Sequence, residues 1–186
     1  TRRPHSGSRH ESLFAFSNHH YYDNRIATFP SPEAESTRMG VRLHLVPSGL
    51  YDRSRTRTNP KEAEALVDEA VRRLWDPFEA ERSIGIVTFN RAQRNLIEDL
   101  LEQKRREHPE IEPHFAESAP EPVFVKSLDC VQGDERDVVL FSVGYGPDES
   151  GRISMNFGPL NREGGERWLN AAISRARPQL VGYASQ

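Results

Sequence analysis

Apolar residues along the chain follow two spacings, and each spacing predicts one kind of element. Short apolar runs that are rich in β-branched residues, or that alternate with polar residues, predict β-strands. Five such runs occur, at residues 41–45, 84–89, 123–126, 138–143 and 180–183. Apolar stripes repeated every three to four residues predict helices. Such a stripe occurs at residues 61–75, and we also predict helices at residues 11–22, 91–101 and 167–175.

The order of these elements indicates the fold class. Predicted strands alternate with predicted helices, which is typical of an α/β fold with a mainly parallel sheet and helices on both faces. The length of 186 residues suits one domain. Residues 1–8 lack an apolar period, so we expect a loose lead-in there and a single domain over residues 9–186.

Composition limits the classes of protein that the chain can belong to. Its apolar runs are far shorter than the roughly 20 residues that cross a bilayer, so no membrane partner is expected. The single cysteine, Cys130, excludes an internal disulfide and fits the reducing cytoplasm, where we expect the protein to reside. The formal charge of -3 gives no overall basic field to attract nucleic acid.

Three kinds of site find no support in the sequence. The adjacent pair His19 and His20 is not accompanied by the spacing of cysteine, histidine and aspartate that a zinc site needs, so we expect no metal site within the chain. No Gly-x-Ser-x-Gly turn is present for a serine hydrolase. A nuclease would need a carboxylate cluster with a lysine, and Glu135 and Asp137 have none beside them.

The predicted topology places several polar residues at one edge of the sheet. In open α/β sheets, ligands bind beyond the carboxyl ends of the strands. The loops that follow Val87, Lys126 and Val143 should therefore share one edge. We expect neighbours in space among the polar residues of these loops, which are Thr88, Asn90, Gln132, Glu135 and residues 142–145.

The polar turn at residues 132–135 has two interpretations. Glycine and short polar residues dominate ordinary strand connections, which favours a plain turn. Alternatively, Gly133 lets the backbone approach a phosphate or sugar, and Glu135 accepts a hydrogen bond from a ribose hydroxyl. Ser127, directly after a predicted strand, could then bond a nucleic-acid phosphate.

Two arginines near the end of the last predicted helix also have two interpretations. Cations are favoured at a helix C-terminus by the helix dipole, which is a sufficient structural reason for Arg175 and Arg177. The alternative is an arginine finger, a guanidinium that stabilises charge on a transferring γ-phosphoryl group.

The segment before the second predicted helix combines a basic loop with a helix cap. Asn59, followed by Pro60, is typical of a cap and first turn. The preceding loop carries Arg53, Arg55 and Arg57, which are either solvated surface charges or phosphate contacts.

Residues 125–140 and 169–177 together resemble motifs V and VI of superfamily 1 helicases, which are ATP-driven motors on nucleic acid. Residues 84–93 are similar to motif IV of the Upf1-like branch, and residues 59–63 match its Asn-x-x-Glu-Ala element. Residues 157–167 look like the bacterial members. The resemblance runs from about residue 8 to residue 185.

This resemblance implies the second RecA-like domain of a helicase, a three-layer α/β sandwich. ATP and magnesium would sit between this domain and a first RecA-like domain of the same polypeptide. Single-stranded nucleic acid would cross both, with DNA favoured over RNA. By position, Arg175 would reach the γ-phosphate. The nucleotide and sugar would be lined by Gln132, Gly133 and Glu135, and the nucleic-acid backbone by Thr88, Asn90 and Ser127.

The chain departs from the family pattern in two places. No Gly-x-x-x-x-Gly-Lys-Ser/Thr loop occurs, so the phosphate cradle and the magnesium ligands would come from the first lobe. The family commonly reads Tyr-Arg-Ser-Arg-His near the start, where this chain has Gly7 in place of the first arginine. We therefore expect half of an ATPase, inactive alone. The alternative is a non-catalytic RecA-like module that binds nucleic acid or protein.

Overall fold

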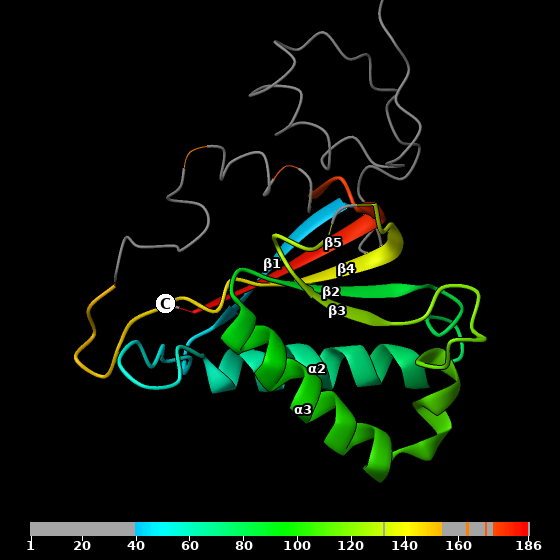
Figure 1. The fold of residues 1–186 in the computed structure, drawn as a ribbon, viewed down its shortest axis with the longest axis horizontal. Coiled ribbons are helices and arrows are strands. Elements are labelled where there is room, and N and C mark those ends of the chain that lie inside the picture. The colour runs from blue at the N-terminus through cyan, green and yellow to red at the C-terminus, as the bar shows by residue number, and fades with distance from the viewer. Residues whose placement is uncertain (1–39, 132, 154–162, 164–169, 171–172, 186) are drawn as a thin grey trace, which may run out of the picture.

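A five-stranded parallel sheet forms the centre of the protein (Figure 1). The computed structural model describes residues 40–131, 133–153, 163, 170 and 173–185. In this part of the chain the strand order is β1-β5-β4-β2-β3, and every pair of neighbouring strands is parallel. The strands are β1 (Gly40–Val46), β2 (Ile84–Thr88), β3 (Phe124–Ser127), β4 (Arg136–Ser142) and β5 (Ala176–Ser185).

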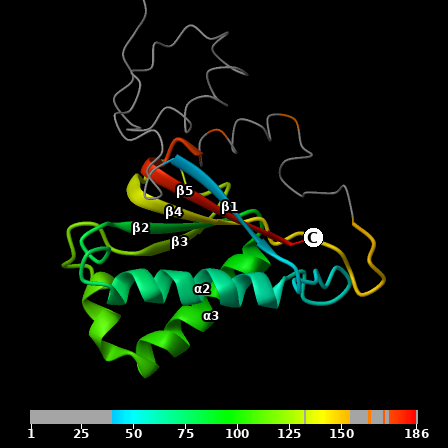
Figure 2. The same ribbon diagram turned by 180° about the vertical axis from the view of Figure 1, so that it is seen from behind.

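Both long described helices lie on the same face of this sheet, as the two opposite views show (Figures 1 and 2). They are α2 (Pro60–Trp75) and α3 (Arg91–Glu107), and a short 3-10 helix, η1 (Pro109–His114), follows α3. The predicted α/β fold with a parallel sheet is confirmed. The predicted helix at residues 11–22 and most of the one at residues 167–175 lie outside the described residues.

The helix starts follow from their caps. The Asn59 side chain accepts a hydrogen bond from the Glu62 amide at 3.2 Å, and Pro60 begins α2. Asn90 does the same for α3, accepting from the Gln93 amide at 2.8 Å. Each cap satisfies an amide that has no partner within its helix. The caps predicted from the sequence are confirmed.

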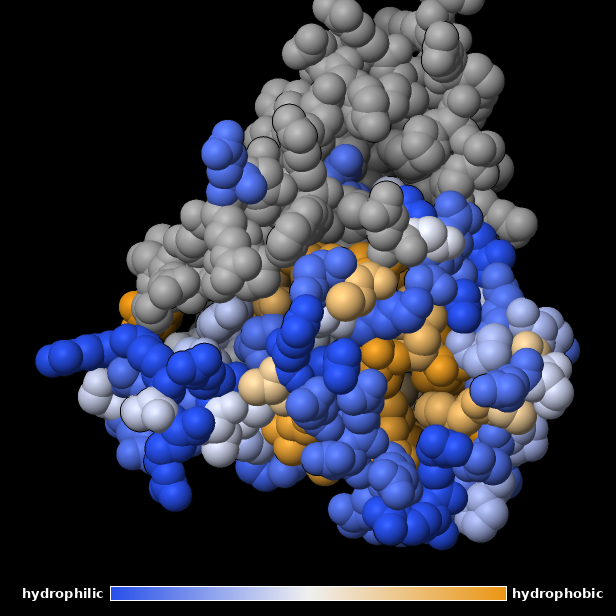
Figure 3. Space-filling model, viewed as in Figure 1, coloured by the Kyte–Doolittle hydropathy of each residue, from blue (hydrophilic) through white to orange (hydrophobic). Residues whose placement is uncertain are grey.

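Alternate residues of the strands contribute to two apolar cores, one on each face of the sheet. Residues such as Ile86 and Leu140 point to the helix side, where they pack with Leu66 of α2. Val87 and Phe141 point to the opposite side, which forms a second buried cluster with several aromatic rings. On the face seen in Figure 3, hydrophilic side chains surround a smaller apolar region. Among the described helices, none has the length and apolar character to cross a membrane.

The sheet has two distinct ends, which carry different residues. We call the end where the strands finish the carboxyl edge. There Thr88 of β2 lies level with Ser127 of β3 and Ser142 of β4. We call the end where the strands start the amino edge. There Arg136 of β4 lies level with Ala176 of β5.

Candidate functional site

The residues singled out from the sequence fall into two groups, one at each edge of the sheet. Thr88, Asn90 and Ser127 lie at the carboxyl edge, where β2 and β3 end. Glu135 and Arg175 lie at the amino edge, directly before β4 and β5. Gln132 lies outside the described residues.

The expectation that Glu135 would share an edge with Thr88 is therefore wrong. Parallel strands β3 and β4 are joined without a helix, so residues 128–135 must return from the end of one strand to the start of the next. Glu135 ends that return and lies beside the start of β5. Gly133 within it has φ 94°, a backbone angle that favours glycine. A side chain there would meet no other atom within 4 Å, so the space at Gly133 is open.

Thr88 and Asn90 are held by the turn that starts α3. The Thr88 side chain is buried, and its hydroxyl donates to the Asn90 carbonyl at 2.9 Å. The Asn90 side chain accepts from the Gln93 amide. Both side chains therefore already make hydrogen bonds within the turn, which fixes the turn in place at the carboxyl edge.

Ser127 is engaged in a way that the sequence did not indicate. Its buried hydroxyl donates to the Asp129 carboxylate at 2.5 Å, and Asp129 also pairs with Arg91 at 3.0 Å. The Ser127 hydrogen bond, together with Arg91, holds the pKa of Asp129 below its usual value. A phosphate near Ser127 would meet this carboxylate first. The Arg91 side chain, 73% exposed, is the nearby cation that sequence reasoning missed.

Behind this edge lies a buried polar network that joins α2 and α3 to the ends of β4 and β5. Its members are Asn59, Glu62, Gln93, Ser142 and Ser185. The Gln93 side chain accepts from the Asn59 amide at 2.8 Å and donates to the Asn59 carbonyl at 3.1 Å and to the Ser142 hydroxyl at 3.1 Å. These hydrogen bonds hold the starts of both helices against the ends of β4 and β5.

Glu62 occupies the centre of this network. Its carboxylate accepts from the Ser142 hydroxyl and the Gly144 amide, each at 2.7 Å, and from the Ser185 hydroxyl at 3.3 Å. Burial raises the pKa of Glu62 to about 7, and the hydrogen bonds from Gly144 and Ser142 offset this only in part. No described cation pairs with Glu62, so its charge depends on these donors. The signal in the sequence was the Asn-x-x-Glu-Ala element, whose buried role the pattern does not reveal.

Replacing Asn59 by alanine should destabilise the protein by about 2 kcal/mol or more. The variant removes a helix cap, which contributes about 1 kcal/mol, and removes the amide donor to the half-buried Ser185 hydroxyl, which costs a similar amount. Urea unfolding measures the difference. Asn95→Ala, at an exposed position of α3, is the matched control and should change stability by about 0.5 kcal/mol at most. Equal stability of the two variants would contradict this role.

At the amino edge, the two arginines of the last motif have different surroundings. Arg177 pairs with Glu121, contacts Asp137 at 3.2 Å, and donates to the Ser83 hydroxyl at 2.9 Å. These interactions hold the Arg177 side chain against the start of β4 and the residues that precede β2 and β3. Arg175 donates to the Ser174 hydroxyl at 2.9 Å and is half-buried at the amino edge.

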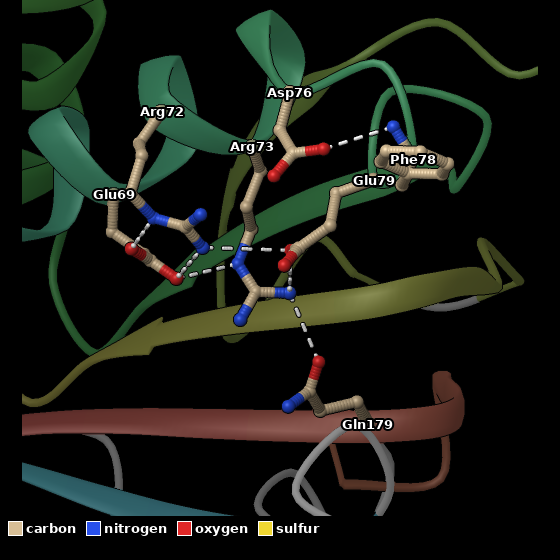
Figure 4. A network of polar contacts seen from close by, with 7 residues as sticks. All are labelled: Glu69, Arg72, Arg73, Asp76, Phe78, Glu79 and Gln179. Carbon is tan, nitrogen blue, oxygen red and sulfur yellow. Dashed lines mark hydrogen bonds and ion pairs between the residues drawn. The ribbon is translucent and has the colours of Figure 1, made fainter.

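The backbone that carries Arg175 is fixed from two sides. Its carbonyl accepts from the Arg136 amide at 3.0 Å. The side chain of Gln179, the fourth residue of β5, accepts a hydrogen bond from the buried Arg73 of α2 at 2.9 Å. Arg73 also forms ion pairs with Glu69 and Glu79 (Figure 4). This network ties the end of α2 to the start of β5. Arg175 is therefore presented from an anchored strand.

The described residues do not form a complete site for a nucleotide with its metal. They contain no group of three histidine, cysteine, aspartate or glutamate side chains that could hold a metal ion. The phosphate-binding loop is absent from the sequence as well. The amino edge offers a guanidinium and a carboxylate, which can complement a nucleotide bound elsewhere.

One family model and two related proteins match nearly the whole chain. The model of the AAA domain family matches residues 9–185. The chain is 33% identical over 180 residues to an uncharacterized ATP-dependent helicase, MG140, of Mycoplasma genitalium, and 31% identical over 183 residues to its homolog in Mycoplasma pneumoniae. Each match covers 95% of this chain, which spans 15% of the length of either relative.

Among solved structures, the C-terminal domain of a possible DNA helicase from Lactobacillus plantarum WCFS1 matches with 16% identity and a TM-score of 0.49. The match covers 97% of this chain and 88% of that one.

Proposed function

The chain belongs to the AAA domain family, and we propose that it is a C-terminal, superfamily 1 helicase-like domain that serves as the second motor lobe of an ATP-dependent helicase or translocase. It supplies an arginine finger and part of the track for nucleic acid. The first RecA-like lobe, with the phosphate-binding loop and the magnesium ligands, comes from the same polypeptide outside residues 1–186. We assign the lobe to residues 9–186.

The separation of the two groups of residues carries this proposal. A motor lobe needs one surface for the nucleotide and another for the strand, joined by a rigid body. Glu135 and Arg175 lie at the amino edge, and Thr88, Asn90 and Ser127 at the carboxyl edge. The parallel strands run from one edge to the other, and the Glu62 network holds the start of α2 against their carboxyl ends.

In this proposal Arg175 acts on the γ-phosphate held by the first lobe. When the two lobes close, its guanidinium stabilises the charge that develops on the transferring phosphoryl group. Arg177 does not compete for this role, because Glu121 and Asp137 hold it. Gly133 and Glu135 bind the nucleotide and its sugar, and we assign the same role to Gln132 from its place in the motif. This lobe alone hydrolyses ATP at no useful rate.

At the carboxyl edge, Thr88, Asn90 and Ser127 hold the backbone of a single strand, with DNA favoured over RNA. Backbone contacts carry no sequence information, which suits a protein that moves along any sequence. The exposed Arg91 adds a cation to this surface, and its ion pair with Asp129 would open when a phosphate arrives.

The second candidate function is a non-catalytic module that binds nucleic acid or protein through the same fold. The observation that favours it is that the sequence of 186 residues holds no phosphate-binding loop. The test is ATP hydrolysis by the complete protein, with and without single-stranded DNA. A motor shows strand-stimulated turnover. Absence of turnover under both conditions would overturn the motor and leave the binding module.

A further inference from the structure

Two arginine-bearing loops lie side by side at the carboxyl edge, away from Thr88, Asn90 and Ser127. Residues 47–59 follow β1 and residues 143–153 follow β4, and both views show the two loops together (Figures 1 and 2). The Tyr51 amide donates to the Pro147 carbonyl at 2.9 Å, which joins them. A hollow of about 500 Å³ between them is lined partly by Arg53 and Arg55.

The guanidinium groups of these loops have few partners. Among the described residues, the side chains of Arg55, Arg57 and Arg152 make no ion pair or hydrogen bond. Arg53 reaches Asp148 only at 3.9 Å and is 45% exposed. By contrast, Arg72, Arg73 and Arg105 on the helix side each make ion pairs at short distances. The arginines of the two loops are therefore available to an anion from outside.

The aspartates of the same loops are engaged by their own turns. Asp52 accepts from the amides of Arg55 and Thr56, at 3.1 and 3.2 Å. Asp148 accepts from the amides of Ser150 and Arg152, at 2.9 and 3.0 Å. These carboxylates order the loops, and their oxygens face backbone amides. The remaining acid, Glu149, is exposed and should oppose an anionic ligand.

The backbone at Arg57 adds a second observation. Its φ is 58°, in the left-handed region that costs a non-glycine residue about 1 kcal/mol. The Arg57 amide donates to the Asp52 carbonyl at 2.7 Å, and the Asp52 amide donates to the Thr58 carbonyl at 2.9 Å. The loop is thus closed on itself in a conformation that an arginine does not favour. Strain of this kind is concentrated at binding sites.

We propose that these two loops form a second binding site for the sugar-phosphate backbone of a single strand, with Arg55 and Arg57 as its main phosphate contacts. The proposal rests on the proposed function and extends its track. In the strand order, β4 lies two spacings and β1 four spacings from β3, so the new site lies roughly 10 to 19 Å from Ser127 along the same edge, at about 4.8 Å per spacing. A strand crossing the edge could contact both sites at once.

The test is the salt dependence of binding by the complete protein to a fluorescently labelled oligothymidylate. Each lost phosphate contact on a single strand should reduce the slope of log K against log salt by about 0.7, so Arg55→Ala combined with Arg57→Gly should reduce it by about 1.4. Glycine at residue 57 keeps the positive φ without strain, so the loop should stay folded. Glu149→Gln should tighten binding.

The matched control combines Arg42→Ala with Arg106→Ala. Both arginines are exposed, and they lie on β1 and at the last turn of α3, away from the carboxyl edge. The control should keep the slope of the wild type. If the wild type binds but the loop variant keeps its slope, or if the control lowers it equally, the second site is overturned. Failure of the wild type to bind any single strand would instead overturn the proposed function.

Discussion

Replacing Arg175 by alanine should reduce strand-stimulated ATP turnover about 10³-fold or more, the size expected for a lost arginine finger. The reason is the loss of a positive charge that an anchored strand start presents to the γ-phosphate. Turnover by the complete protein at saturating ATP and single-stranded DNA measures the effect. Strand affinity should stay near that of the wild type, because Arg175 lies at the other edge of the sheet.

Arg106→Ala is the control, since it removes the same charge from the exposed end of α3. It should leave turnover unchanged. Wild-type turnover in Arg175→Ala would remove this arginine from the chemistry and leave the helix dipole as the reason for its position.

Replacing Glu62 by glutamine should flatten one part of the dependence of stability on pH. Burial raises the pKa of Glu62 to about 7 in the folded protein, from an ordinary value of 4.5. The folded state therefore binds this proton more tightly than the unfolded state. The associated stability is fully present below about pH 4.5 and is lost as the pH rises through about 7.

A shift of this size corresponds to about 3 kcal/mol of unfolding free energy at most. Relative to Glu62→Gln, the wild type should lose nearly that amount between about pH 5 and pH 8. Urea unfolding at the two pH values measures it. Glu64→Gln, on a more exposed carboxylate of the same helix, should follow the wild type. Parallel curves for the wild type and Glu62→Gln would show that Glu62 does not titrate in this range.

The helices and strands could be predicted from the sequence because their signals are local. The alternation in β1, the β-branched run of β2 and the apolar stripe of α2 each needed only their own residues. The caps at Asn59 and Asn90 needed only the adjacent turn. Position along a parallel sheet also predicted that Thr88 and Ser142 would be neighbours at one edge.

What could not be predicted depends on contacts between distant segments. Glu135 was expected beside Thr88 because the length of the return after β3 is invisible in a pattern of apolar residues. Glu62 resembles an ordinary acidic residue in a first helical turn, and only the fold places it under Ser142 and Ser185. For the same reason, the sequence did not show that the Ser127 hydroxyl donates a hydrogen bond to the Asp129 carboxylate.

We propose that the two edges of this sheet have separate roles, one in binding the strand and one in ATP hydrolysis. A paired measurement of strand affinity and ATP turnover tests this separation. Single-strand affinity and ATP turnover at saturating strand are measured on Arg91→Ala and Arg175→Ala of the complete protein, because Arg91 is the exposed cation of the carboxyl edge. We expect weakened affinity with normal turnover for Arg91→Ala, and normal affinity with lost turnover for Arg175→Ala. Loss of both properties in both variants, with folding intact, would contradict it.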